Sequence, residues 1–144
     1  MGTVVLSIDA ELGWGFHDLE SPSRERIERS REGWLVLANL LDEYEIEGTF
    51  CVPGLTAERY PEAVEEIVSR GHELACHGYT HRGYNALDPE QEREWIVKSR
   101  EILEGFTGAR VVGHRTPRWR PSEHTHGFLE ELGFKWNSDY MGSE

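Results

Sequence analysis

Two histidines, His77 and His81, stand four residues apart in the segment His-Gly-Tyr-Thr-His. Neutral imidazole nitrogens are good ligands for a borderline-soft divalent ion such as zinc. A spacing of four residues lets both rings converge on one point when the segment makes a single turn. The pair alone says little, because the chain contains seven histidines and two solvated loop histidines would give the same pattern. Whether the two histidines belong to a metal site depends on the other polar residues that could act as ligands with them.

Two carboxylates that could complete a metal site follow the apolar run 3–8, namely Asp9 and Glu11. A catalytic zinc site needs three protein ligands and one open position, and a carboxylate with two histidines is a known set. Glu11, His77 and His81 could therefore bind the metal. Asp9 would then serve as the general base for a water at the metal. The longer side chain of Glu11 leaves the reverse open, with Asp9 as the ligand.

An arginine, Arg115, follows another apolar run, 111–114, and could form an ion pair with Asp9. A guanidinium on a carboxylate keeps the carboxylate ionised and fixes its direction. Taken singly, the two acids could be loop caps and the arginine a structural partner. Together, at the ends of consecutive predicted strands, these residues favour a hydrolytic site.

The segments that must position these residues alternate in type along the chain. Apolar, strand-like runs cover residues 3–8, 48–52, 72–76, 111–114 and 134–138, and predicted helices begin near residues 24, 61, 88 and 122. Regular alternation of this kind predicts a parallel sheet or barrel of βα units. Sites in such folds form beyond the carboxyl ends of the strands, which is where all the candidate residues fall.

The apolar residues of these segments predict the core. The run 3–8 is β-branched and mostly apolar, as in a strand buried on both faces. One stripe of the first helix carries Ile27, Trp34, Leu37, Ala38 and Leu41, which should face the core. Ser122 is expected to cap the last helix, which runs through Leu132. Cys51 and Cys76 lie inside strand-like runs without a CxxC pair, which predicts buried thiols.

The composition limits the class of protein and its partners. With 27 acidic and 15 basic residues, the net charge is −12, which disfavours nucleic acid and anionic membranes as partners. Thirteen of the basic residues are arginines, and an acidic surface poor in lysine suggests a halophilic protein working at high salt. No leader segment or long apolar run is visible, so we expect a cytoplasmic protein. A length of 144 residues without repeats or linkers predicts one domain, 1–144.

Three segments resemble the signature motifs of the polysaccharide deacetylases, metal-dependent carbohydrate esterases with a NodB-like domain. Leu-Ser-Ile-Asp-Ala-Glu at 6–11 resembles the first motif, a strand that ends in a base Asp and a metal-binding acid. The segment 71–81 resembles the second motif most closely. Gly-His-Arg-Thr-Pro at 113–117 is similar to the third motif, whose Arg contacts the base. The resemblance extends from residue 3 to about residue 140.

The resemblance implies a distorted (β/α) barrel of seven or eight strands, of which this chain would supply about five βα units. Ala10 separates the two acids of the first motif, and this variant is similar to the peptidoglycan-deacetylase-like and allantoinase-like branch, as is the segment 133–140. The last motifs, an Asp-containing strand and a strand with the general-acid His, find no match before Glu144. We therefore expect an incomplete barrel, with an unpaired edge strand through which a homo-oligomer could form.

The resemblance also implies roles around the metal, with zinc as the first expectation. The ion would polarise an acetamide carbonyl and lower the pKa of its bound water from 15.7 toward about 7, and Asp9 would take a proton from that water. The backbone N–H of Arg118 would help to hold the tetrahedral oxyanion. Trp14 and Trp119 could stack on a sugar ring, although tryptophans near a core more often serve packing.

The implied reaction is hydrolysis of a non-peptide amide C–N bond. N-deacetylation of an N-acetylated carbohydrate is the first expectation, and hydrolysis of a small, allantoin-like amide is the second. A competing hypothesis is a catalytically incomplete fragment that retains metal or sugar binding, because the last motifs have no match. In each case the expected partner is a carbohydrate or a small amide.

Overall fold

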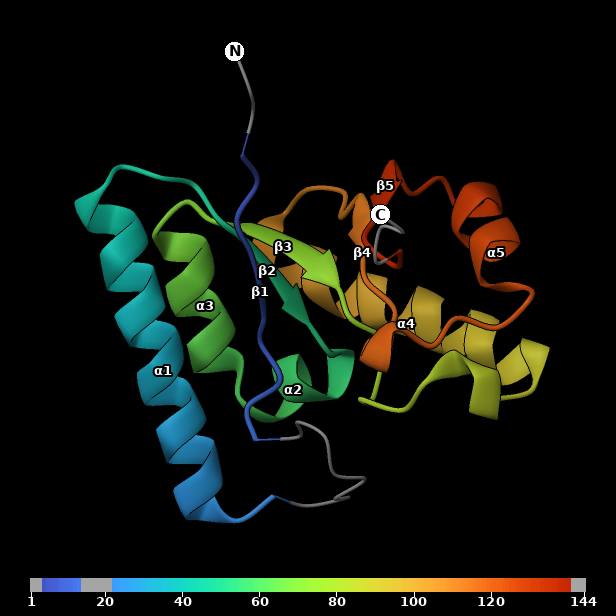
Figure 1. The fold of residues 1–144 in the computed structure, drawn as a ribbon, viewed down its shortest axis with the longest axis horizontal. Helices are drawn as coiled ribbons and strands as arrows, with labels where there is room; N and C mark the ends of the chain where they lie inside the picture. Colours follow the sequence, from blue (N-terminus) through green and yellow to red (C-terminus); the bar gives the residue numbers. More distant parts are fainter. Residues whose placement is uncertain (1–3, 14–21, 141–144) are drawn as a thin grey trace.

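The computed structural model describes residues 4–13 and 22–140, which form one layered α/β unit (Figure 1). The five strands are β1 (Ser7–Asp9), β2 (Thr49–Val52), β3 (Glu73–Cys76), β4 (Gly113–His114) and β5 (Trp136–Asn137). The helices are α1 (Arg24–Glu43), α2 (Gly54–Arg59), α3 (Pro61–Ser69), α4 (Pro89–Thr107) and α5 (Thr125–Glu131). Two 3₁₀ turns, η1 (Tyr84–Ala86) and η2 (Pro117–Trp119), complete the elements.

The strands form a single parallel sheet in the order β1-β2-β3-β4-β5. In register, Asp9 lies opposite Cys51, and Cys76 lies opposite His114. The chain therefore leaves β1, β3 and β4 at the same edge of the sheet, where the three candidate motifs continue. The prediction of parallel βα units forming part of a barrel is confirmed.

The core lies between the central strands and the helices that pack on them. Every residue of β2 is buried, as are the last three residues of β3. The helices contribute mainly Trp34, Ala38 and Leu41 from α1, Val64 and Ile67 from α3, and Leu103 from α4. Uninterrupted burial of this kind is what a parallel strand covered by helices requires. The central strands thus give the site a rigid support.

Local signals fix where the helices begin and end. The carboxylate of Asp88 accepts a hydrogen bond from the Gln91 N–H at 2.9 Å, and Pro89 occupies the first turn, so α4 begins where the sequence predicted a helix start, near residue 88. Pro61 likewise starts α3. Gly108 ends α4 with a φ of +62°, in the left-handed region that glycine adopts without strain.

The first strand and helix bury less than the sequence predicted. β1 is confined to residues 7–9, and Val4 and Val5 before it are 83% and 76% exposed. The expectation of a strand buried on both faces is wrong, because all three residues of β1 are only partly buried, and among the described strands β1 pairs with β2 alone. Leu37 of α1 is also 41% exposed, since the buried stripe of the helix passes through Trp34 and Leu41.

Two other differences concern short segments. Helix α2 was not predicted, because only six residues separate Pro53 from the turn before Pro61. Helix α5 begins at Thr125, three residues later than expected, since the Ser122 hydroxyl accepts from His124 N–H within the preceding turn.

The two cysteines match their prediction as buried, free thiols. Burial raises the pKa of both Cys51 and Cys76 to about 12, so they stay protonated and unreactive at neutral pH. Among the described helices, none has the length and apolar character needed to cross a membrane.

Candidate metal centre

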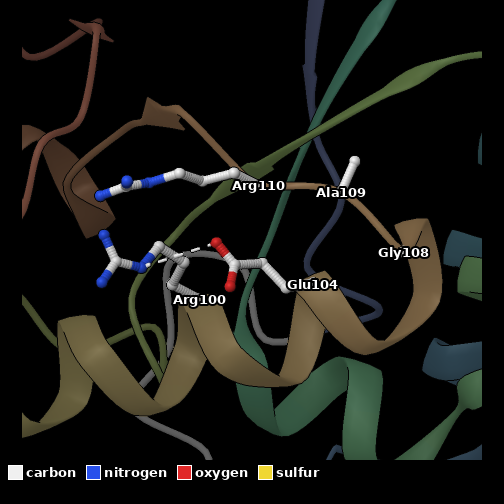
Figure 2. A pocket seen from close by; sticks show the side chains of 5 residues that line it. All are labelled: Arg100, Glu104, Gly108, Ala109 and Arg110. Carbon is white, nitrogen blue, oxygen red and sulfur yellow. Dashed lines mark ion pairs between the residues drawn. The ribbon is translucent and has the colours of Figure 1, made fainter.

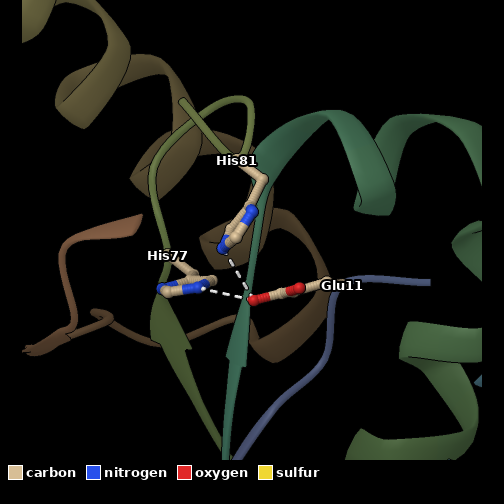
Figure 3. Close-up of side chains that lie close together, drawn as sticks. All are labelled: Glu11, His77 and His81. Atoms are coloured by element: carbon tan, nitrogen blue, oxygen red, sulfur yellow. Dashed lines mark hydrogen bonds and ion pairs between the residues drawn. The ribbon is translucent and has the colours of Figure 1, made fainter. Parts of the chain in front are cut away.

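Glu11, His77 and His81 converge at the carboxyl end of the sheet (Figure 3). Oε1 of Glu11 lies 2.8 Å from Nε2 of His81 and 3.3 Å from Nε2 of His77. The three potential ligand atoms all lie within 4.8 Å of one another. His77 is buried, and the side chains of His81 and Glu11 are nearly so. One carboxylate and two imidazoles form a donor set that suits zinc.

The second motif, which contains both histidines, makes a turn directly after β3. His77 is the residue after the strand, and Gly78 follows it with a φ of +70°. A Cβ on Gly78 would lie 2.6 Å from Cγ of Pro117, so only glycine fits the close approach of these two motifs. The Gly78 carbonyl accepts hydrogen bonds from the Ser99 hydroxyl and from the Gly54 N–H, both at 2.9 Å. The turn that brings His81 back to His77 is therefore held on several sides.

A backbone contact sets the tautomer of His77. Its Nδ1 lies 2.8 Å from the carbonyl oxygen of Arg115. A carbonyl only accepts, so Nδ1 carries a proton, and the other ring nitrogen, Nε2, faces Oε1 of Glu11. Metal-ligating histidines typically donate their other ring N–H in this way. The third motif thus orients a candidate ligand of the second motif.

The charge state of Glu11 also suits a ligand. Partial burial alone would raise the pKa of this carboxyl. Hydrogen bonds and attraction from His77 and His81 outweigh burial and lower the pKa from 4.5 to about 2. Glu11 is therefore a carboxylate across the physiological range.

Asp9 lies in a separate contact from these ligands. Its Oδ1 accepts a hydrogen bond from Nη1 of Arg115 at 2.5 Å. Nη2 of Arg115 donates to the Ser7 hydroxyl at 2.6 Å and to the Ser138 hydroxyl at 2.8 Å, and Nε donates to Ser138 at 3.1 Å. The structure thus groups Glu11 with the imidazoles and Asp9 with the guanidinium. This grouping supports the assignment of Glu11 as ligand and Asp9 as base over the reverse, and the roles themselves stay predictions.

The predicted substrate-binding residues are only partly described. Arg118 and Trp119 follow the third motif with φ values of 61° and 49°, in a left-handed turn that non-glycine residues seldom adopt. Trp119 is 40% exposed, and its indole N–H donates to the Ser138 carbonyl at 3.0 Å. Its ring therefore has one fixed edge and a partly open surface. Trp14, the other predicted aromatic contact, lies outside the described residues.

Sequence reasoning missed the residues that hold Arg115. Ser7 and Ser138 supply hydroxyl acceptors, and Asp139 accepts from the Thr116 N–H at 2.6 Å. Ser7 belongs to the first motif and faces the same side of β1 as Asp9, which is a signal that the period of two could have given. Ser138 and Asp139 carried no such signal, because their role depends on how β5 pairs with β4.

A cavity near the surface lies elsewhere and does not belong to this site (Figure 2). It has a volume of about 480 Å³ and is lined by Arg100, Glu104, Gly108, Ala109 and Arg110. Both arginines donate to the carbonyl of Leu132, at 2.7 and 2.8 Å. These guanidiniums therefore hold the end of α5, and the cavity opens where the chain enters β4, at the opposite edge of the sheet from the histidines.

Comparison with known proteins adds a family to this geometry. Residues 16–136 match the sequence model of the family Polysaccharide deacetylase. A peptidoglycan deacetylase from Helicobacter pylori is 30% identical over 143 residues, which cover 96% of this chain and 49% of that protein. The chain therefore spans about half the length of this relative.

Solved structures give the same picture. A Mycobacterium smegmatis protein classed with the polysaccharide deacetylases is 34% identical, with a TM-score of 0.79 over 95% of this chain and 50% of that chain. A CE4-family pseudoenzyme from Bacillus anthracis has the same fold, with a TM-score of 0.76 at 16% identity over 92% of this chain and 41% of that chain. The fold alone therefore does not establish turnover.

Proposed function

Because this chain belongs to the polysaccharide deacetylase family, we propose that it serves the metal-dependent N-deacetylation of an N-acetylated carbohydrate. One observation carries the proposal. The carboxylate and two imidazoles of Glu11, His77 and His81 meet beside the ion pair of Asp9 and Arg115. A ligand set next to an oriented carboxylate is an arrangement that suits metal-assisted hydrolysis of an amide.

A divalent ion held by the three ligands would polarise the acyl carbonyl and acidify a water, as zinc does in hydrolytic sites. Residues of the chain would supply the general base and hold it in position. Arg115 pairs with Oδ1 of Asp9, and the other carboxylate oxygen is the one we expect to accept the proton of the attacking water. The guanidinium fixes the direction of that carboxylate, and it is itself held in place by hydrogen bonds to the hydroxyls of Ser7 and Ser138.

The turn after Arg115 would contribute to stabilising charge in the transition state. The left-handed backbone at Arg118 and Trp119 turns the chain after the extended Thr116 and changes the direction of the N–H groups of this segment. Fixed N–H donors aimed at a developing oxyanion are a major source of rate enhancement in acyl transfer. The partly exposed ring of Trp119 is a surface on which a sugar could stack.

A second candidate keeps the metal or sugar site without turnover. It is favoured by the fold that the chain shares with a pseudoenzyme. A small, allantoin-like amide remains the alternative substrate class for an active site of this composition.

Metal analysis combined with an acetate-release assay separates these candidates. We expect about one equivalent of divalent metal in the purified wild-type chain, and zinc is the metal that we expect first. The pair of substitutions His77→Ala and His81→Ala should abolish it, whereas the exposed His124→Ala should not. Unchanged metal content in the double variant would overturn the site. Retained metal without acetate release from an N-acetylglucosamine oligomer would favour the binding-only candidate.

A further inference from the structure

We propose that Ser138 and Asp139, which follow β5, form a clamp that positions Arg115 for the reaction, with His126 as the partner of Asp139. We call these three residues the β5 clamp. The inference rests on the proposed function, because the position of Arg115 matters for catalysis only if Asp9 is the base. None of the three contacts a candidate metal ligand directly, so they act as positioning residues.

Asp139 is the first part of the clamp. Its side chain has no exposed surface, and Oδ1 accepts from the Thr116 N–H at 2.6 Å. Thr116 directly follows Arg115, so this bond fixes the backbone that carries the guanidinium. Burying a carboxylate is costly unless hydrogen bonds or a cation compensate it, and one backbone N–H is a small compensation. The second oxygen of Asp139 therefore needs its own partner.

His126 is that partner. Its Nε2 lies 3.3 Å from Oδ2 of Asp139, which is within ion-pair distance but without hydrogen-bond geometry, and both atoms are buried with no hydrogen bond among the described residues. The ring stacks on Tyr140, with centroids 5.3 Å apart. The imidazole is thus the polar group that faces the second oxygen of Asp139. Asp139 thus links helix α5, the end of β5 and the turn of the third motif.

Ser138 is the second part of the clamp and contacts the guanidinium itself. Its hydroxyl accepts from Nε and Nη2 of Arg115 at 3.1 and 2.8 Å. Its own backbone is fixed at both polar groups, since its N–H donates to the His114 carbonyl at 3.0 Å and its carbonyl accepts from Trp119. Together with Asp9 and Ser7, it fixes the planar guanidinium from several directions.

The same clamp reaches the metal ligands through the backbone. The carbonyl of Arg115 accepts from Nδ1 of His77, so a shift of this residue moves both the partner of Asp9 and the ring of a candidate ligand. Misplacing a catalytic group by about 1 Å can lower a rate by about a hundredfold. The clamp should therefore act mainly on turnover, with little effect on substrate affinity.

Turnover measurements test the clamp directly. Asp139→Ala should lower kcat by about tenfold to a hundredfold while KM stays within about twofold. Ser138→Ala should lower kcat by about tenfold, and Ser138→Thr, which keeps the hydroxyl, should restore most of it. Glu123→Ala, in the exposed turn before α5, is the matched control and should behave as wild type.

A double-mutant cycle shows whether Asp139 acts through Arg115. In an Arg115→Lys background, Asp139→Ala should cost less than about threefold, because the residue that it positions has already lost its planar grip. Independent, multiplicative losses would overturn the clamp, as would wild-type kcat in Asp139→Ala.

Amide hydrogen exchange keeps the inference separate from the proposed function. If the wild-type chain releases no acetate, the proposed function fails for this chain, and exchange still decides the clamp. Asp139→Ala should speed exchange at Thr116 by about tenfold or more, and leave exchange at the β2 amides unchanged. Unchanged protection at Thr116 would overturn the clamp, and uniform loss of protection throughout the chain would reduce it to a structural role.

Discussion

The third-motif turn and the β1–α1 side of the molecule bury opposite kinds of surface. At the turn, polar groups such as His77, Arg115 and Asp139 are buried and paired with one another or with backbone. At β1 and α1, apolar side chains such as Val5 and Leu40 lie exposed. The polar groups of the turn are thus as closely packed as a hydrophobic core, whereas part of the apolar surface of β1 and α1 is left exposed.

The difference teaches which part of the sheet determines the site. The polar groups lie on β3, β4 and β5, whose ends are tied to each other by backbone bonds such as Arg115 N–H to Cys76 O at 2.8 Å. Asp9 joins them from the outer strand through one ion pair with Arg115. The candidate base therefore sits on the less supported side and depends on the arginine for its position.

Loss of the base itself is the largest effect that we expect. Asp9→Asn keeps the shape of the side chain but cannot accept a proton from water. In a chain with measurable turnover, kcat should fall by about a hundredfold to ten-thousandfold, with metal content unchanged. Metal analysis and acetate release on the same preparation measure both. Loss of metal in this variant would reverse the assignment of the two acids.

Arg115→Lys sharpens the comparison between the two regions, because it removes the planar contact of Arg115 with Asp9 and keeps the positive charge at position 115. Lysine lacks the planar fork that reaches Asp9, Ser7 and Ser138 together. We expect kcat to fall by about tenfold to a thousandfold, and metal content to survive. Full activity here, with Asp9→Asn inactive, would leave the base in place and remove its proposed orienting residue.

The sequence predicted the well-packed region better than the exposed one. The runs that became β2 and β3 are apolar without alternation, which is typical of strands covered on both faces, and Asp88 with Pro89 marked the start of α4 correctly. The exposure of Val4 was not predictable in this way. Hydrophobicity shows that a residue favours burial, but not which element covers it.

The grouping of the candidate residues was predictable to the same extent, whereas their roles stay predictions. Acids, histidines and arginine at strand ends indicated Glu11, His77 and Arg115, because ligand chemistry restricts the residue types. Ser138 was missed, since a serine can serve many roles and only the pairing of β5 with β4 brings it to the guanidinium. The residues that support a site are determined by which segments pack together, and a single sequence shows little of that packing.

Two adjacent leucines of α1 test the contrast in packing on one helix. Leu41 is 6% exposed and faces the core, whereas Leu40 is 49% exposed. Leu41→Ala should lower the free energy of unfolding by about 2–5 kcal/mol, and Leu40→Ala by about 0.5 kcal/mol or less. Urea unfolding monitored by circular dichroism measures both. Equal losses would mean that the exposed side of α1 is covered in solution, and the comparison would fail.

The smallest expected effect is the pH dependence that His114 adds at the centre of the polar region. Its ring is buried, with Nε2 3.1 Å from the Tyr84 hydroxyl. Burial first, and then the charges of His77 and His126, lower the pKa of His114 from 6.5 to about 3. The unfolded chain therefore binds a proton below pH 6.5 that the folded chain refuses, so stability is complete above pH 6.5 and falls as the pH drops toward 3.

For this one group, the loss between pH 6.5 and 5.5 is about 1 kcal/mol, and this window lies above the range in which Glu11 titrates. Urea unfolding at the two pH values should therefore give a smaller difference in His114→Gln than in wild type. The exposed His124→Gln is the control and should keep the wild-type difference. An unchanged slope in His114→Gln would mean that this ring is solvated or protonated in the folded protein. The polar region would then be less tightly packed than the comparison requires.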